Sequence, residues 1–154
     1  MSKNKIVPII VYFASIVVVA VLGSIFVNIG MAWFDGLRKP IQWIPNFIIP
    51  IVWTVIYAIF ALIGYLWIKN DGLPMGITIL LALNGILNIL WCLLFFSINL
   101  TFVGLIAIVL NLIAGVLLVV NIYNKNKPYG LLGIIYPVWL SLATCLNLAL
   151  WILN

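Results

Sequence analysis

The side chains of this sequence that could do chemistry are almost all aromatic or amide. The chain has seven Trp and six Tyr but no His, and only two of its 154 residues are acidic. Acid–base catalysis, proton relays and most metal sites therefore lack the residues that they need. Cys92 and Cys145 lie inside apolar runs and are interpreted as small buried residues. What remains is stacking by aromatic rings, hydrogen bonding by amides, and redox chemistry at Trp and Tyr.

Three predicted helical faces collect these side chains. Within each set the spacing is three or four residues per step, which places the members on one side of a helix. The sets are Pro50, Trp53 and Tyr57; Asn84, Asn88, Trp91 and Phe95; and Trp139, Ala143 and Asn147. Because an amide is costly to bury in hydrocarbon, we expect these faces to point into a helix bundle.

The inward faces indicate a slot for a flat aromatic ligand. Trp53 and Trp139 offer indole surfaces for stacking, and Ala143 leaves room one turn from Trp139. The alternative is that the two rings only fill the bundle core. Asn84 and Asn88 could contact a ligand or could join helices by hydrogen bonds. For Asn147, near the end of its helix, the helix-joining role is the favoured interpretation.

The composition indicates which class of protein holds these helical faces. Apolar residues make up 68% of the chain and charged residues 6%, whereas soluble domains carry about 25% charged residues. The chain is therefore predicted to be an integral membrane protein, and disorder, a secreted disulfide scaffold and nucleic-acid binding are excluded. The net charge of +5 is scattered over the gaps between apolar runs.

The apolar runs predict an all-α, five-transmembrane-helix bundle. About 20 apolar residues cross a bilayer, and five such spans fill residues 1–154 as a single domain without a soluble part. The spans lie near 6–27, 47–68, 75–96, 102–123 and 130–153. An odd number places the termini on opposite sides. Five Lys on the N-terminal side against two basic residues opposite predict a cytoplasmic N-terminus and an external C-terminus.

The predicted loop at residues 28–46 is much longer than the others. It contains two Trp, which favour the membrane interface, so the loop could be an anchor, a lid over a binding site, or both. We expect it to cover the mouth of the pocket, with prolines stiffening its turns. The residues assigned to this lid are Asp35, Arg38, Pro40 and Pro45.

Three segments resemble the motifs of the tryptophan-rich sensory protein (TspO) family, which includes the mitochondrial translocator protein. Residues 39–57 are similar to its K-P, P-N and P-V-W-T-x-x-Y pattern. Residues 87–96 resemble L-N-x-x-W followed by F-F, and residues 136–147 resemble Y-P, W and A-T-x-L-N. The motifs follow one another in order along the whole chain. One Arg against six Lys is typical of a bacterial member from an AT-rich genome.

The resemblance implies a membrane protein, commonly dimeric, that binds porphyrins such as protoporphyrin IX. It also implies a site for isoquinoline-carboxamide and benzodiazepine ligands between the helices, under the first loop. The implied ligand-binding residues are Trp53, Tyr57, Asn84, Asn88, Trp91, Trp139 and Ala143. Trp53 and Trp139 are also implicated in light-dependent degradation of protoporphyrin by some bacterial members.

Three functions remain open from the sequence. The favoured one is a binding or sensory protein for tetrapyrroles, the second is an enzyme that degrades porphyrin oxidatively, and the third is a porphyrin transporter. No metal site and no cofactor other than the porphyrin itself are expected. The lack of nucleotide motifs and acid–base pairs disfavours a conventional enzyme or a driven pump.

Overall fold

A computed structural model describes residues 3–41 and 43–154, and all the regular structure in these ranges is helical. Five stretches are long and apolar enough to cross a membrane, as predicted. In chain order the elements are α1 (Lys3–Gly36), α2 (Ile48–Asn70), α3 (Met75–Cys92), the π-helix η1 (Leu93–Ser97), α4 (Thr101–Lys125), α5 (Lys127–Gly133) and α6 (Ile135–Leu153). The third span is α3 continued by η1, and the fifth is α5 continued by α6.

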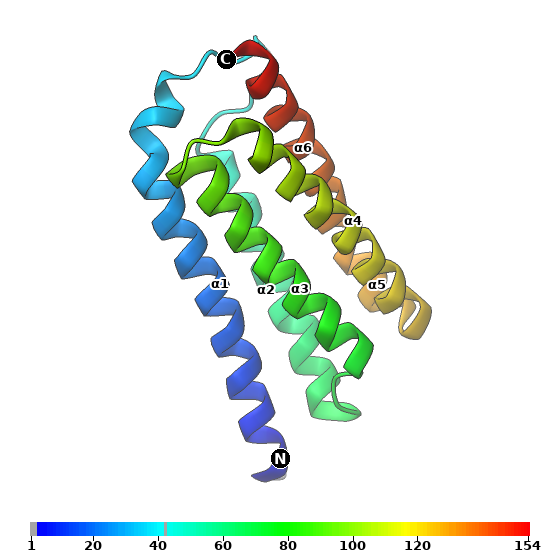
Figure 1. The fold of residues 1–154 in the computed structure, drawn as a ribbon. Coiled ribbons are helices and arrows are strands. Elements are labelled where there is room, and N and C mark those ends of the chain that lie inside the picture. The colour runs from blue at the N-terminus through cyan, green and yellow to red at the C-terminus, as the bar shows by residue number, and fades with distance from the viewer. Residues whose placement is uncertain (1–2, 42) are drawn as a thin grey trace.

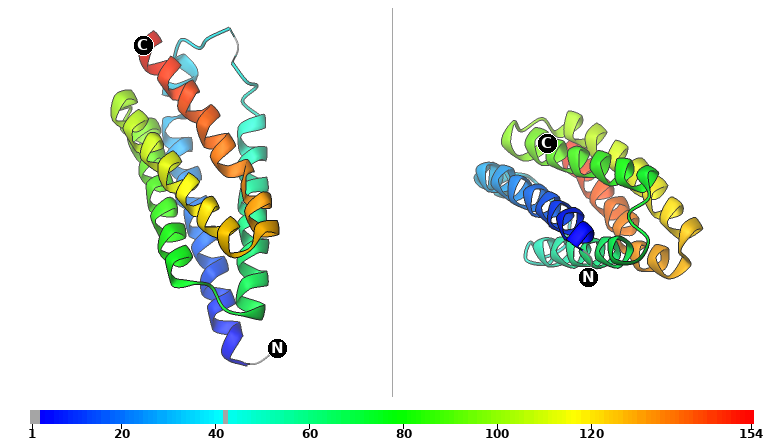
Figure 2. Two further views of the ribbon diagram at one scale, coloured as in Figure 1. Left: turned by 90° about the vertical axis from the view of Figure 1, so that its right-hand side faces the viewer. Right: turned by 90° about the horizontal axis from the view of Figure 1, so that it is seen from below.

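The spans form a closed ring (Figures 1 and 2). Helix α1 packs against α2, α3 and η1, and α4 packs against α3 and α6. Helix α2 completes the ring against α5 and α6, but it approaches α6 closely only over a short length. The outer faces carry exposed Ile, Leu and Val, as expected for contact with lipid. Large side chains fill the space between α2 and α6.

The first span is longer than predicted. Helix α1 runs to Gly36, whereas the sequence analysis ended the span at residue 27. The helix continues because its last turns pack against η1: Ser97 Oγ donates a hydrogen bond to the carbonyl oxygen of Phe26 (2.9 Å), and Phe34 is buried. The described non-helical residues between the first two spans are therefore 37–41 and 43–47 rather than 28–46, and this segment is called the connection 37–47. Asp35, assigned to the lid, lies in the last turn of α1.

Residues with special backbone roles end several helices. Asn99 has a φ of 63°, and the amide of Leu100 donates to the carbonyl oxygen of Leu94 (2.9 Å), so the chain turns back on η1 where this helix ends. Gly72 takes the left-handed conformation after α2, with a φ of 86°. The Asn126 side chain caps α5. The fifth span breaks around Ile134, close to Pro137, which cannot donate a helical hydrogen bond.

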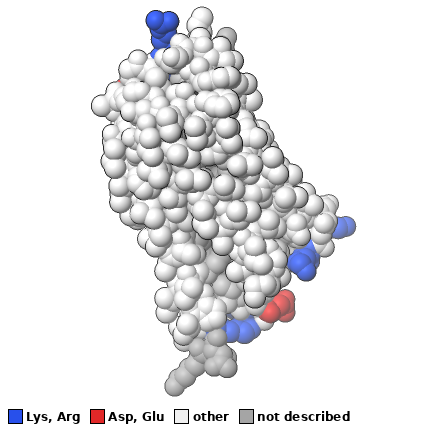
Figure 3. Space-filling view, viewed as in Figure 1, with Lys and Arg blue, Asp and Glu red and all other residues white. Residues whose placement is uncertain are grey.

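The charged residues lie at the two ends of the bundle. The C-terminus and residues 37–47 share one end, and the N-terminus lies at the other (Figure 1). Figure 3 shows charged side chains only near these ends of the face in view. Lys5 donates to the carbonyl oxygens of Lys69 and Asn70 (both 2.7 Å), which ties the start of α1 to the end of α2. The side chain of Lys3 lies outside the described part of the chain.

The two cysteines have different surroundings. Cys92 is buried, as expected, but Cys145 is exposed. The expectation was wrong for Cys145 because an apolar run in a membrane helix contains both inward and outward positions, and Cys145 occupies an outward one. Lipid rather than protein covers such a position in a bilayer.

Candidate functional site

A small cavity lies between α2, α3, η1 and α6, beneath the end of α1 and the connection 37–47. Its volume is about 40 Å³. Seven of its twelve lining residues are aromatic. The lining residues are Phe34, Trp43, Ile49, Trp53, Trp91, Phe95, Phe96, Trp139, Ala143, Leu146, Asn147 and Leu150. Such a lining suits an apolar ligand with a flat π-surface.

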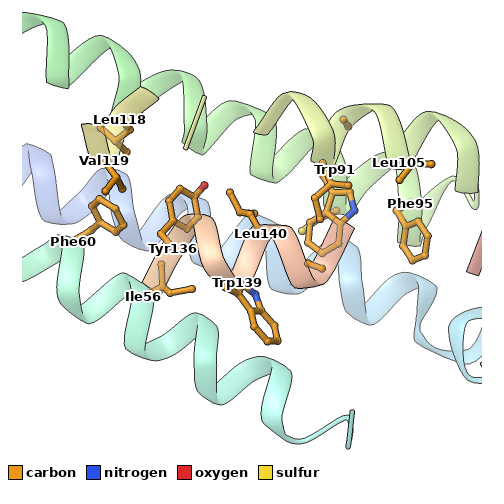
Figure 4. Close-up of a cluster of buried hydrophobic side chains, with 14 of the residues drawn as sticks. Ile56, Phe60, Trp91, Phe95, Leu105, Leu118, Val119, Tyr136, Trp139 and Leu140 are labelled. Carbon is orange, nitrogen blue, oxygen red and sulfur yellow. The ribbon is translucent and has the colours of Figure 1, made fainter. Parts of the chain in front are cut away.

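Trp53 of α2 is the centre of a continuous aromatic cluster. Its ring lies 5.8 Å from that of Tyr57 in a stacked arrangement, and 6.3 Å from that of Trp91. Tyr136 of α6 meets it edge-on at 6.4 Å. In Figure 4, Trp139 points from α6 toward α2. Aromatic rings thus fill space between α2 and α6.

Asn147 fixes the orientation of one cavity wall. Its Oδ1 accepts a hydrogen bond from Trp91 Nε1 (3.1 Å), and its Nδ2 donates to the carbonyl oxygen of Ala143 (2.9 Å). Asn147 therefore joins α3 to α6, as the sequence predicted, and also lines the cavity. Trp139 Nε1 is buried and has no hydrogen-bond partner among the described residues. That N–H is an unused donor beside the cavity.

The other buried asparagines form hydrogen bonds between helices outside the cavity lining. Asn88 Nδ2 donates to the hydroxyl oxygen of Tyr57 (3.1 Å), which links α3 to α2. The Tyr136 hydroxyl lies 3.2 Å from Oδ1 of both Asn84 and Asn111. A hydroxyl donates one hydrogen only. Asn84 Nδ2 already donates to a backbone carbonyl, so Asn84 Oδ1 is the atom that accepts the hydrogen of Tyr136. The Asn111 amide is then best oriented with its nitrogen toward the Tyr136 oxygen, to which it can donate.

The connection 37–47 covers the cavity through Trp43. The amide of Trp43 donates to the carbonyl oxygen of Pro40 (3.1 Å), and its Nε1 donates to Asn46 Oδ1 (3.0 Å). Its ring lies 5.8 Å from that of Phe34, which closes the cavity from α1. Because its polar contacts lie within the connection, Trp43 is expected to move with that segment when the cavity opens.

The end of α6 holds the same connection at a second point. Asn154 Oδ1 accepts a hydrogen bond from the amide of Arg38 (2.9 Å), and Asn154 Nδ2 donates to the carbonyl oxygen of Arg38 (3.1 Å). The same Nδ2 also donates to the carbonyl oxygen of Leu150, a cavity residue. This reciprocal pair joins residues that are 116 positions apart in the chain.

Comparison with known proteins identifies the family of the chain. Residues 12–152 match the sequence model of the TspO/MBR family. The chain belongs to the TspO/MBR family. It is 29% identical over 154 residues to the tryptophan-rich protein TspO of Archaeoglobus fulgidus, covering 97% of this chain and 99% of the relative.

Two further relatives are similar to this chain over most of their length. The tryptophan-rich protein TspO of Chlorobaculum tepidum is 33% identical over 138 residues, which is 86% of each chain. Protein CrtK of Rhodobacter capsulatus is 28% identical over 149 residues, covering 94% of this chain and 91% of the relative. The similarity thus extends over all five spans.

The structure brings together only part of the site that the TspO/MBR resemblance implied. Four of the implied ligand residues line the cavity, and Tyr57, Asn84 and Asn88 lie beside it in hydrogen bonds between helices. The four are Trp53, Trp91, Trp139 and Ala143. The sequence analysis did not assign Phe34 or Trp43 to the site. Phe34 was missed because the first helix was ended too early, and Trp43 was placed in the loop expected to cover the pocket but not among the ligand residues.

Replacing Asn154 by Ala is expected to loosen the connection 37–47. The variant loses both hydrogen bonds to the Arg38 backbone, so we expect faster amide exchange in this segment, measured by hydrogen–deuterium exchange in detergent. Asn121→Ala is the matched control, because Asn121 makes the same bond to the carbonyl four residues earlier, Leu117. Unchanged exchange in Asn154→Ala would show that the pair does not hold the segment.

Proposed function

We propose that this TspO/MBR protein binds porphyrins such as protoporphyrin IX in the aromatic cavity, in a sensory or tetrapyrrole-regulating role. The observation that carries the proposal is the cavity wall, built from four Trp and three Phe on five different elements and the connection. A planar conjugated ring gains stacking energy from such walls, about 0.5–1.5 kcal/mol for each aromatic pair. Isoquinoline-carboxamide and benzodiazepine compounds share the flat aromatic shape and are proposed for the same cavity.

Ligand entry requires the cavity to expand. Sites for small molecules measure about 300–1,000 Å³, whereas this cavity measures about 40 Å³. The connection 37–47 is the wall that can move at least cost, because it is non-helical and attaches to α6 through the Asn154 side chain. We infer that it swings outward with Trp43 while the helices keep their positions.

The test of the proposed function is absorbance of the purified protein with protoporphyrin IX, first in the dark and then under illumination. A saturable spectral shift in the dark supports binding, and a shift that grows linearly with protein and detergent alike contradicts it. Light-dependent bleaching with a new pigment would support the second candidate, porphyrin degradation. That candidate is favoured by Trp53 and Trp139, two oxidisable indoles that both line the cavity.

The proposed placement in the cell membrane has the N-terminal end in the cytoplasm. The five Lys of the chain that lie at or near this end outnumber Arg38 and Lys39 at the other, which agrees with the positive-inside rule. A homodimer, common in the resembled family, is proposed as the assembly. Cysteine accessibility at the two ends and mass measurement of the detergent-solubilised protein test these two points.

Ala143→Thr is expected to weaken binding of planar ligands about tenfold while the fold is retained. Ala143 lines the cavity and is 6% exposed, so the added atoms must occupy space that the ligand would use. Overpacking of this kind costs about 1–3 kcal/mol. Fluorescence titration with protoporphyrin IX measures the effect. Unchanged affinity together with a normal melting temperature would show that Ala143 does not contact the ligand.

A further inference from the structure

Among the described residues, cationic side chains occur near the site only at the mouth of the cavity, where the connection 37–47 covers it. Arg38 and Lys39 begin the connection 37–47 that covers the cavity. The other described cations belong to the opposite end of the bundle: they lie near the start of α1, the end of α2 and the α4–α5 junction (Figures 1 and 3). They are Lys5, Lys69, Lys125 and Lys127.

The Lys39 ammonium lies against the cavity wall. Its Nζ is 4.6 Å from the centroid of the Phe34 ring, which lines the cavity. Nζ donates to the carbonyl oxygens of Phe34 (2.9 Å) and Asp35 (3.3 Å). Since an ammonium group has three N–H donors, one remains for a further acceptor. The cation is thus fixed at the end of α1, one aromatic ring away from the cavity.

Arg38 supplies a second cation, on an exposed residue whose backbone is held in place. Its backbone is held by the two hydrogen bonds that it makes with Asn154, one donated and one accepted, while the residue as a whole is exposed. A guanidinium group offers paired N–H donors that match a carboxylate. The backbone restraint holds Arg38 at the start of the connection that covers the cavity without using any of its side-chain donors.

The cavity itself is unsuited to a negative charge. Asn147 and the indole N–H groups supply its polar atoms, and no charged side chain lines it. Moving a carboxylate into such surroundings is strongly unfavourable. A ligand with an apolar ring and an acidic edge must therefore place the ring among the aromatic side chains and leave the acidic edge at the mouth.

We propose that Arg38 and Lys39 form a carboxylate subsite, which selects planar ligands that carry an acidic edge and orients that edge toward the connection 37–47. The inference rests on the proposed function, because it specifies which porphyrins the cavity prefers and how they lie in it. Ligands of the same shape without an acidic group bind without the contribution of these two cations.

The test compares protoporphyrin IX with its uncharged dimethyl ester. Each is titrated in the dark against protein in phosphatidylcholine nanodiscs, with empty nanodiscs subtracted and Trp fluorescence as the readout. Arg38→Gln and Lys39→Gln are compared with Lys69→Gln, a matched control whose ammonium lies 5.8 Å from the Tyr65 ring at the opposite end. We expect Arg38→Gln to weaken binding of the acid about fivefold, the upper range for an exposed ion pair, and to change binding of the ester less than twofold.

Three outcomes separate this inference from the proposed function. A selective loss for the acid in Arg38→Gln, absent in Lys69→Gln, supports the subsite. Equal behaviour of acid and ester in Arg38→Gln, with both bound by the wild-type protein, overturns the subsite and leaves porphyrin binding intact. Failure of the wild-type protein to bind either form overturns both. Arg38→Gln decides the question even if Lys39→Gln fails to fold, because the structural contacts of Arg38 are made by its backbone.

Discussion

Gly30→Ala is expected to destabilise the protein by about 3 kcal/mol and to abolish porphyrin binding. A Cβ atom at Gly30 would clash with the carbonyl oxygen of Phe96. The obstacle is backbone, so α1 and η1 must separate, and forced overpacking typically costs about 1–3 kcal/mol. Separation displaces Phe34, Phe95 and Phe96, which line the cavity. Thermal denaturation in detergent and a dark titration with protoporphyrin IX measure the two effects.

Gly36→Ala is the matched control for this prediction. Gly36 ends the same helix, and a Cβ atom there meets nothing within 4 Å. We expect no loss of stability, and a gain of up to about 1 kcal/mol because alanine favours helix more than glycine does. Equal melting temperatures for Gly30→Ala and the wild-type protein would contradict the inference that α1 packs against η1 through close backbone contact at Gly30.

Trp53→Phe and Trp139→Phe are expected to abolish light-dependent bleaching, if the protein degrades protoporphyrin, while keeping porphyrin affinity within a few-fold. Phenylalanine retains much of the stacking surface but removes the readily oxidised indole. Trp53 also lies in ring contact with Trp91 and Tyr57, so an oxidised indole there has aromatic neighbours on two sides. The measurement is the rate of absorbance loss under illumination, normalised to the amount of bound porphyrin.

The control for the bleaching experiment is Trp151→Phe. Trp151 lies on the same helix as Trp139, but it is exposed and packs against Phe102, away from the cavity. Its substitution should leave both binding and bleaching unchanged. Bleaching at the wild-type rate in both cavity variants would mean that the porphyrin is destroyed by ordinary photosensitised chemistry, and the protein would then be a binder only.

The sequence alone determined the number of spans, their all-helical nature and the placement of the termini at opposite ends. These features follow from the length of uncharged apolar runs, because a bilayer requires about 20 such residues for each crossing and satisfies no unpaired backbone group. The family motifs likewise pointed to Trp53, Trp139 and Ala143, which do line one cavity. Local spacing was sufficient here because the positions of the residues along each helix define the face that points into the bundle.

The tertiary structure decided how far the first helix extends, which residues close the cavity and how wide the cavity is. Helix α1 continues to Gly36 because of contacts with η1, some 70 residues away, and no local signal in residues 28–36 encodes those contacts. The same holds for Asn154, whose partner Arg38 is 116 positions distant.

The tertiary structure also decided the role of two asparagines. Periodicity shows that Asn84 and Asn88 face inward, but their amides could form hydrogen bonds either with another helix or with a ligand. Only the arrangement of neighbouring helices distinguishes them, since it places Tyr57 and Tyr136 within reach.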